Sequence, residues 1–248
     1  MLIAANWKMN LGKSEIDEFS KILQSNEFHD SLDICIFPPS VYINYLNTRI
    51  ENLPISIGAQ NCYHEFSGAF TGEVSPTSLK DIGCKYVLVG HSERRTLFHE
   101  SNQVISKKLI QANKYSLVPI LCIGESAKEY QDNITHEILQ QQILEGLNGS
   151  TEMSSLIIAY EPIWAIGSGQ TPTPEEINSV HEMIKDVVQS RFPKIDLVSV
   201  LYGGSVNITN AASLFDQKNI DGALIGGASL DGKDFASIAN IFNEIKVR

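Results

Sequence analysis

The chain has 248 residues, of which 43% are hydrophobic and 19% are charged, and its formal net charge at pH 7 is −10. An acidic chain without a basic block is not expected to bind nucleic acid or an anionic membrane, and no apolar run approaches the roughly 20 residues of a membrane helix. The first residues lack the basic start of a signal peptide, so we expect a cytoplasmic globular protein of one large domain or two small ones.

Short apolar runs alternate with amphipathic stretches along the whole chain. Runs rich in β-branched residues and bounded by turn residues predict buried strands. Eight such runs follow one another, at 2–5, 33–37, 55–59, 86–89, 118–123, 156–160, 197–202 and 222–225.

Helices are predicted between the strands. Ser14 is the expected N-cap of the first helix. Ser75 followed by Pro76 opens a short helix that Gly83 ends, and 173–176 is a capping box with a proline inside it. Apolar stripes at helical spacing mark four of the helices: Ile16, Phe19, Ile22 and Leu23; Val104, Ile105, Leu109 and Ala112; Ile138, Leu139, Ile143, Leu144 and Leu147; Phe235, Ile238, Ile241, Phe242 and Ile245.

The strand-and-helix units follow one another without a Pro/Gly/Ser-rich linker or a low-complexity segment. Such a series favours parallel strands joined by right-handed crossovers, and eight units close into a (β/α)8 barrel of about this length. We therefore predict one α/β domain, a TIM barrel, over residues 1–248. The alternative is an open doubly wound sheet, but such sheets usually carry a glycine fingerprint after the first strand, and this chain has none there.

The four cysteines, Cys35, Cys62, Cys84 and Cys122, are far apart and form no Cys-x-x-Cys motif. We expect reduced thiols that are mostly buried in strands, as in a cytosolic protein. The histidines show no metal-ligand spacing, so no metal site is predicted.

Polar residues gather where the predicted strands end, which is where barrels place their function. Asn6 and Lys8 follow the first strand, His91 follows the fourth and Glu161 follows the sixth. On one face, these residues supply a carboxylate, an imidazole and an ammonium group. This set can take a proton from carbon, polarise a carbonyl and stabilise an oxyanion.

Each of the three ionisable residues also has a structural interpretation. Glu161 could be a solvated loop acid, but it directly follows an apolar strand. His91 could be a core histidine, but a helical segment begins at Ser92, and a helix N-terminus favours a neutral imidazole that can donate a hydrogen bond. Lys8 could be a surface lysine, but it follows a buried strand, with Asn6 two residues before it.

Two glycine-rich turns, 203–205 and 226–230, follow the last two predicted strands. Barrels commonly bind phosphate at this place, and a short helix starting near Ala228 would direct its positive end at the ligand. Either turn alone is most simply an ordinary loop. The pair at these two strand ends favours a phosphate site.

The segment after Glu161 has the pattern of a lid over a site. It begins with the stiff Pro162, continues with large apolar residues and ends in the flexible sequence Gly-Ser-Gly at 167–169. Lids of this kind exclude water and complete a site around bound substrate.

Five motifs together, at 6–10, 90–95, 159–167, 202–206 and 226–230, resemble the triosephosphate isomerase family, and the match runs from residue 2 to the last helix. The resemblance implies an intramolecular oxidoreductase that interconverts dihydroxyacetone phosphate and D-glyceraldehyde 3-phosphate through an enediol or enediolate. This is a reaction of glycolysis and gluconeogenesis. It also implies that no cofactor and no metal is needed.

The resemblance implies a role for each residue of the site, in a division of labour already known for this family. Glu161 matches the catalytic base and His91 the neutral electrophile. Lys8 matches the cation that stabilises substrate and enediolate charge, with Asn6 beside it, and Glu93 matches a supporting acid near that lysine.

Substrate and phosphate contacts follow from the same motifs. The segment 162–170 matches the closing lid, and Ile166 with Leu224 matches an apolar clamp that desolvates the base and raises its basicity. The residues expected to bind the substrate and its phosphate are Asn6, Lys8, Gly167, Ser205, Gly226 and Gly227.

The family is usually homodimeric, and residues 60–73 resemble its interface loop, from which Thr71 would reach towards the neighbouring site. Three positions depart from the family pattern. Ser168 and Gln170 replace the more usual Thr and Lys in the lid, and His99 stands where glycine is usual, which would strain or repack the start of the following helix.

Two alternative functions are weighed against this one. Another phosphate-binding barrel, such as a sugar-phosphate epimerase or a biosynthetic isomerase, would explain the glycine turns but not the trio Lys8, His91 and Glu161. A catalytically silent barrel that serves as a binding or scaffold protein would have no need to keep all three.

Overall fold

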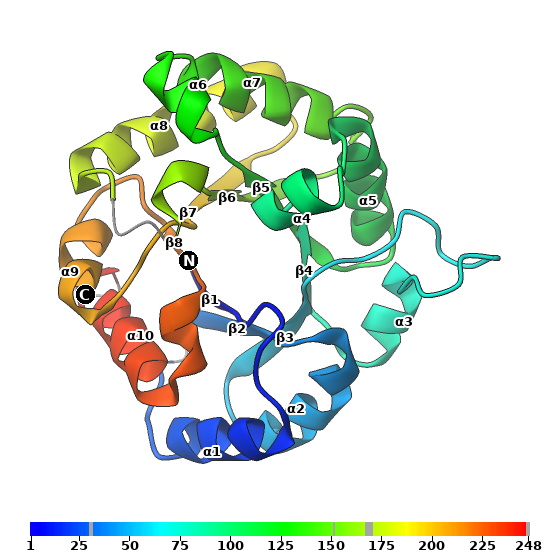
Figure 1. Ribbon diagram of the computed structural model, residues 1–248, viewed down its shortest axis with the longest axis vertical. Helices are drawn as coiled ribbons and strands as arrows, with labels where there is room; N and C mark the ends of the chain where they lie inside the picture. The colour runs from blue at the N-terminus through cyan, green and yellow to red at the C-terminus, as the bar shows by residue number, and fades with distance from the viewer. Residues whose placement is uncertain (30–31, 151, 167–170, 247–248) are drawn as a thin grey trace.

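A computed structural model of the chain describes residues 1–29, 32–150, 152–166 and 171–246. Its strands are all parallel and form a closed barrel in the order β1 to β8, with the helices in a ring outside (Figure 1). The barrel closes where β1 pairs with β8, with Leu2 opposite Gly222. The predicted (β/α)8 TIM barrel is therefore confirmed.

The strands agree with the predicted runs to within one residue at either end. Most strand residues are buried because helices cover the outer face of the barrel and side chains fill its inside. The exceptions lie chiefly at strand starts, as at Leu197, which is 70% exposed. The strands are β1 (Leu2–Asn6), β2 (Asp33–Phe37), β3 (Ile55–Ala59), β4 (Tyr86–Val89), β5 (Val118–Ile123), β6 (Ser155–Tyr160), β7 (Leu197–Tyr202) and β8 (Gly222–Ile225).

The helices include several that the sequence analysis did not single out, among them α2, α6 and α9. The α-helices are α1 (Lys13–Gln24), α2 (Ile43–Ile50), α3 (Pro76–Asp81), α4 (Ser92–Leu97), α5 (Asn102–Lys114), α6 (Ala127–Gln131), α7 (Thr135–Gly146), α8 (Pro174–Arg191), α9 (Ile208–Phe215) and α10 (Gly232–Lys246). Short 3-10 turns are η1 (Ser40–Tyr42), η2 (Ile163–Ala165) and η3 (Gly227–Leu230).

Two of the three predicted N-caps are confirmed. The Ser75 hydroxyl accepts the backbone N–H of Ser78 at 3.1 Å. Thr173 accepts the N–H of Glu176 at 3.2 Å, and the Glu176 carboxylate accepts the N–H of Thr173 at 2.7 Å. This reciprocal pair fixes the start of α8.

The expected cap at Ser14 is wrong. The N-cap of α1 is Gly12, and the Glu15 carboxylate accepts its N–H at 2.7 Å. Because Glu15 already satisfies this donor and its charge suits a helix N-terminus, the helix starts before Ser14 without a hydroxyl cap.

The segment after β4 forms two helices, α4 and α5, with His99 between them. His99 is exposed and has a φ of 54°, which lies in the left-handed region. An L-residue with a side chain pays roughly 1–2 kcal/mol there. Of the two outcomes considered for His99, backbone strain is therefore the one observed.

The interior has two apolar layers. One fills the barrel and includes Phe37, Leu88 and Leu201, and the larger one lies between the strands and the helices. All four cysteines are free and buried, as predicted, although only Cys35 and Cys122 lie within strands. Burial raises the pKa of Cys62 and of Cys84 to about 12, which keeps these thiols protonated near neutral pH.

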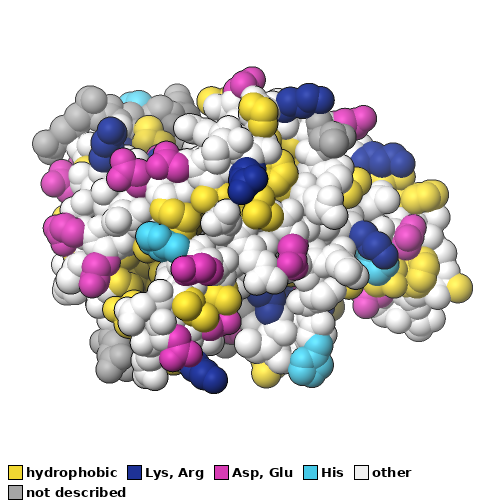
Figure 2. Space-filling model, turned by 90° about the horizontal axis from the view of Figure 1, so that it is seen from above, with side chains coloured by type: hydrophobic (Ala, Val, Ile, Leu, Met, Phe, Trp, Pro, Cys, Tyr) yellow, Lys and Arg dark blue, Asp and Glu magenta, His cyan; other side chains and the backbone are white. Residues whose placement is uncertain are grey.

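Charges of both signs are dispersed over one face of the molecule. On the face shown in Figure 2, Lys and Arg side chains are separated by acidic and uncharged ones and form no continuous basic patch. In the part of the chain that the structure describes, every helix is too short or too polar to cross a membrane.

One buried titratable group couples the fold to pH. His181 of α8 is fully buried, its Nδ1 lies 3.2 Å from the carbonyl oxygen of Asn219, and its ring meets Tyr160 edge-on. Burial lowers its pKa from 6.5 to about 3, and the nearby Lys185, paired with Asp221 at 2.8 Å, adds to this. Folded His181 is therefore neutral where the unfolded side chain binds a proton.

We predict that His181 weakens the fold as pH falls from 6.5 towards 3. In that window only the unfolded chain protonates this residue, so its contribution to the free energy of unfolding drops by about 1.4 kcal/mol per pH unit. Urea unfolding of His181→Gln at a series of pH values is expected to show a shallower pH slope than the wild type. The exposed His136→Gln is the control, and equal slopes in all three proteins would contradict the prediction.

Candidate active site

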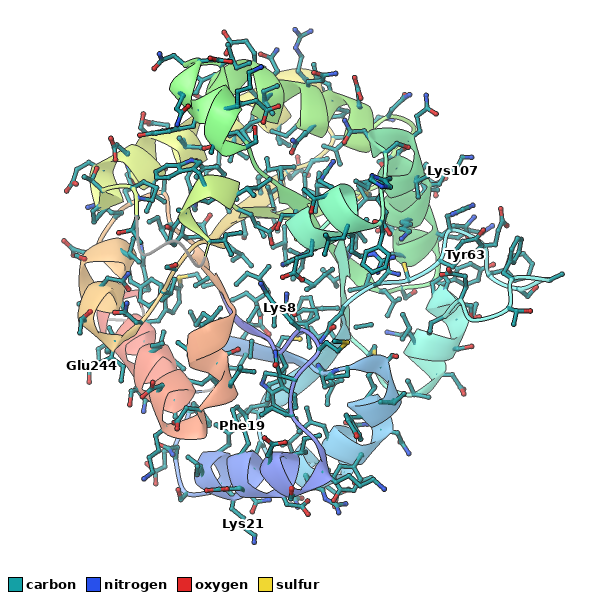
Figure 3. The ribbon with its side chains drawn as sticks, viewed as in Figure 1. Lys8, Phe19, Lys21, Tyr63, Lys107 and Glu244 are labelled. Carbon is teal, nitrogen blue, oxygen red and sulfur yellow. The ribbon has the colours of Figure 1, made fainter. Side chains whose placement is uncertain are left out.

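A cavity of about 280 Å³ opens at the carboxyl ends of the strands. It brings together residues from opposite ends of the sequence, and Figure 3 shows Lys8 near the barrel axis whereas Lys21 and Glu244 lie on the outer helices. The lining residues include nine that were predicted for the site, namely Asn6, Lys8, His91, Glu161, Ile166, Ser205, Leu224, Gly226 and Gly227.

Glu161 is the buried acid of this cavity, with 1% of its surface exposed. One carboxylate oxygen, Oε1, lies 3.1 Å from Nε2 of His91. The other, Oε2, accepts the backbone N–H of Ser92 at 2.8 Å. These donors offset the cost of burying the carboxylate, and they orient it towards the end of β4.

Glycines allow Glu161 to sit between the ends of β5 and β7. A Cβ at Gly124 would lie 1.8 Å from the Glu161 carbonyl oxygen, and a Cβ at Gly203 would lie 2.8 Å from its Cγ. The backbone of the segment is fixed on both sides. The Glu161 N–H donates to the carbonyl of Ile123 at 2.7 Å, and the Gly203 N–H donates to the carbonyl of Tyr160 at 2.7 Å.

His91 is positioned by the turn that starts α4. Its Nδ1 accepts the backbone N–H of Glu93 at 3.2 Å, and its carbonyl accepts the N–H of Arg94 at 2.8 Å. A ring nitrogen that accepts carries no proton, so the proton of the neutral imidazole is on Nε2. That N–H faces Glu161 and the cavity, where it is available as a hydrogen-bond donor.

Lys8 is held through its backbone. It has a φ of 52°, a rare conformation for a non-glycine residue. Its N–H donates to the Asn6 side chain at 3.0 Å, and its carbonyl accepts from Gln60 at 2.7 Å. Gln60 also donates to the carbonyl of Phe37 at 2.9 Å. Strain that is fixed from several sides is typical of functional residues.

The Lys8 ammonium group forms an ion pair with Glu93 at 2.7 Å. The side chains are 30% and 45% exposed, so the pair contributes little to stability. Its effect is to fix the position of the ammonium group beside His91, which lies on the same turn as Glu93.

The predicted phosphate end of the cavity is lined by backbone. A Cβ at Gly227 would meet nothing within 4 Å, so the peptide groups at the start of η3 are open to a ligand. The turn is held from the end of β1, because Trp7, the buried residue directly after this strand, donates its Nε1–H to the carbonyl of Ser229 at 3.1 Å. Ser205 donates to the carbonyl of Ala165 at 3.2 Å and thereby joins this end to the turn after Glu161.

The loop after Glu161 is described as far as Ile166, which lines the cavity. The remaining part of the expected lid, including the predicted phosphate ligand Gly167 and the departures Ser168 and Gln170, lies outside the described residues.

Sequence reasoning missed three groups that position the site. These are the Ser92 N–H, which binds Glu161, and the side chains of Gln60 and Arg95. Arg95 donates to the carbonyls of Gly90 at 2.7 Å and Cys122 at 3.0 Å, and so connects the ends of β4 and β5. Gln60 directly follows β3, and Arg95 lies in α4, the first helix after β4. Their place after buried strands was the available signal, but their targets are backbone carbonyls that no sequence pattern identifies.

A second hollow of about 600 Å³ adjoins the site and shares Asn6, Lys8 and His91 with it. Exposed apolar side chains line its outer rim, with Met9 at 93%, Leu97 at 70% and Phe98 at 64% of their surface exposed. Large exposed apolar surfaces of this kind mark interaction sites.

Among the residues that the structure describes, no three His, Cys, Asp or Glu side chains lie close enough together to hold a metal ion.

Comparison with known proteins gives a consistent result. The family model described as triosephosphate isomerase matches residues 1–242. A triosephosphate isomerase of Finegoldia magna is 43% identical over 244 residues, which cover 96% of this chain and 97% of that protein. Those of Legionella pneumophila (strain Paris) and Aquifex aeolicus are 39% and 42% identical and cover 98% and 97% of this chain and 98% and 99% of their own lengths.

Proposed function

Because the chain belongs to the triosephosphate isomerase family, we propose that Glu161, His91 and Lys8 carry out the chemistry of that family. The chain is an isomerase that interconverts dihydroxyacetone phosphate and D-glyceraldehyde 3-phosphate, a reaction of glycolysis. The same reaction in reverse serves gluconeogenesis. The whole chain acts as one domain, 1–248, in the cytoplasm.

The observation that carries the assignment is the pairing of Glu161 Oε1 with His91 Nε2 at 3.1 Å inside a cavity that also contains the Lys8 side chain. A base, a hydrogen-bond donor and a cation are the three groups that enolisation needs. Each comes from the end of a different strand, so the barrel sets their spacing.

The reaction moves a proton between neighbouring carbons. Glu161 removes a proton from the carbon beside the carbonyl, and the electron pair of that C–H bond forms the C=C bond of an enediolate. The Nε2–H of His91 turns from Glu161 to the carbonyl oxygen, where negative charge develops. Lys8 stabilises the same charge, and Asn6 and Glu93 hold Lys8 in place. His91 passes the proton of the neighbouring hydroxyl group to the former carbonyl oxygen. Glu161 then returns its proton to the other carbon, and the deprotonated oxygen becomes the new carbonyl.

Glu161 must exchange one hydrogen bond to do this, since both of its oxygens are engaged in the structure. Substrate that takes over the His91 N–H frees Oε1 for the reacting carbon. Ile166 and Leu224 line the same cavity and keep water from the reacting atoms.

The phosphate group is assigned to the opposite end of the cavity. Ser205, Gly226 and Gly227 line it with backbone groups and one hydroxyl, and Lys8 packs over Gly226, whose added Cβ would lie 3.7 Å from Lys8 Cε. In a chain of net charge −10, an anionic substrate has to be bound by such local groups. Gly167 completes this set in the proposal.

The active form is proposed to be a homodimer in which Thr71 of one copy approaches the site of the other. The exposed loop that contains Thr71 projects beyond the helices between β3 and α3 (Figure 1). A projecting loop and an apolar hollow beside the site, on the same chain, are complementary features of a two-fold interface. Exposed Met9, Leu97 and Phe98 would be buried there.

We predict that Glu161→Gln lowers kcat by ~10³-fold or more while the Kd of a phosphate-bearing inhibitor stays within a few-fold, because an amide cannot accept the proton. Glu161→Asp moves the carboxylate by about 1 Å and is expected to lose roughly 10²-fold. A coupled assay with D-glyceraldehyde 3-phosphate measures both. The exposed Glu137→Gln is the control, and near-wild-type turnover of Glu161→Gln would remove the base assignment.

A second prediction concerns the cation. Lys8→Ala is expected to lower kcat/KM by roughly 10²-fold or more, with losses in both KM and kcat, since the ammonium group stabilises bound substrate and enediolate alike. Lys21→Ala, on the outer face of α1 (Figure 3), is the matched control and should be unchanged. Unaltered kinetics in Lys8→Ala would exclude Lys8 from the site.

A third prediction tests the dimer with two leucines of equal exposure. Leu97 and Leu197 are each 70% exposed, but only Leu97 borders the hollow beside the site. Leu97→Asp should shift the protein to monomers in sedimentation equilibrium and reduce activity, because a charge would be buried in the interface. Leu197→Asp should remain dimeric, and a monomeric wild type would contradict the proposed role of Thr71.

A further inference from the structure

The turn η2 links the catalytic acid to the outer helices. Trp164 lies at its centre, three residues after Glu161. Its indole Nε1–H donates to Oε1 of the buried Glu125 at 2.7 Å, and the N–H of Ile163 donates to the Glu125 carbonyl at 3.1 Å. Tyr160 donates to the same carboxylate oxygen at 3.1 Å. Glu125 therefore holds the turn on one edge.

Tyr130 holds the face of the indole. Its ring lies parallel to that of Trp164, with 4.1 Å between ring centroids and 24° between planes. Tyr130 comes from α6, which stands beside η2 on the side away from the barrel (Figure 1). This helix begins with a capping box in which Glu129 accepts the N–H of Ser126 at 2.7 Å. The stacking ring thus rests on a fixed support.

The other side of η2 faces the site. The carbonyl of Ala165 accepts the Ser205 hydroxyl at 3.2 Å, and Ile166 lines the cavity next to Glu161. A rotation of the indole would therefore move the backbone that carries Ile166, whose side chain lines the cavity together with the Glu161 carboxylate. The Glu125 hydrogen bond alone leaves the ring free to pivot about the N–H···O axis, and the stack with Tyr130 removes that freedom.

We propose that Tyr130 is a positioning residue of the isomerase, whose ring fixes the orientation of Trp164 and, through η2, the placement of Glu161 and Ile166 at the reacting carbon. The inference rests on the proposed role of Glu161. This role would give α6 a function that the sequence analysis did not assign to it. Tyr130 is 42% exposed, so its ring contributes chiefly through this contact and not through the core.

Loss of the Tyr130 ring is expected to lower kcat and to leave substrate binding nearly unchanged. Of the described groups assigned above to the phosphate, Gly226 and Gly227 belong to the turn after β8, and only Ser205 bonds to η2, through the Ala165 carbonyl. A loosened turn leaves the carboxylate in its productive place for less of the time. From the usual strength of an aromatic pair, Tyr130→Ala is expected to lower kcat roughly three- to tenfold while KM changes less than twofold.

The test compares Tyr130→Ala with Tyr130→Phe, which keeps the ring, and with Lys128→Ala on the same exposed helix. Tyr130→Phe and Lys128→Ala should match the wild type in kcat. Tryptophan emission supplies a second readout, because the chain has two tryptophans and Trp7 is fully buried. Iodide quenching and a red shift of Trp164 emission should increase in Tyr130→Ala only.

Three results would overturn the inference: wild-type kcat in Tyr130→Ala, an equal loss in Tyr130→Phe, or a loss of kcat without any change in Trp164 emission. The test of Tyr130 can be distinguished from the test of Glu161 as the catalytic base. If Glu161→Gln is inactive but Tyr130→Ala is not impaired, only the role of Tyr130 is lost. If Glu161→Gln is active, the proposed base itself is wrong.

Discussion

The burial of one carboxylate is the constraint on which the rest of the site depends. Glu161 is 1% exposed, and a buried ionised group is tolerated only when its oxygens are hydrogen-bonded. The Ser92 N–H and the His91 imidazole, both from the turn after β4, supply those bonds at 2.8 Å and 3.1 Å. Closure of the barrel brings this turn to the end of β6, and Gly124, directly after the intervening β5, leaves the necessary space.

The same reliance on local groups explains how an acidic protein can bind an anionic substrate. Among the described residues that line the site cavity, Lys8 is the one Lys or Arg side chain. Its backbone is fixed by Asn6 and Gln60, and its Nζ is fixed by Glu93. In the proposed site, peptide N–H groups near Gly227 supply the remainder without any net charge. Local placement, and not the field of the whole molecule, therefore determines where the phosphate binds.

Much of this arrangement could be predicted from the sequence, and the exceptions have a common cause. Local sequence patterns correctly predicted the strands, the caps at Ser75 and Thr173, and the polar residues at the strand ends. The start of α1 was misplaced because the Glu15 carboxylate accepts the N–H of Gly12 and so replaces a serine cap. The Ser92 N–H and the contacts of Gln60 depend on which strand ends lie side by side, and that is a property of the closed barrel. The stack of Tyr130 on Trp164 joins segments 34 residues apart and belongs to the same class.

The central claim is that Glu161 carries the proton between the two carbons. Exchange of carbon-bound hydrogen with D₂O, followed by proton NMR of the triose phosphates, measures that transfer directly. The wild type should incorporate deuterium beside the carbonyl during turnover, and Glu161→Gln should lose this exchange by ~10³-fold or more while it still binds a phosphate-bearing inhibitor. Exchange at the wild-type rate in Glu161→Gln would contradict the account.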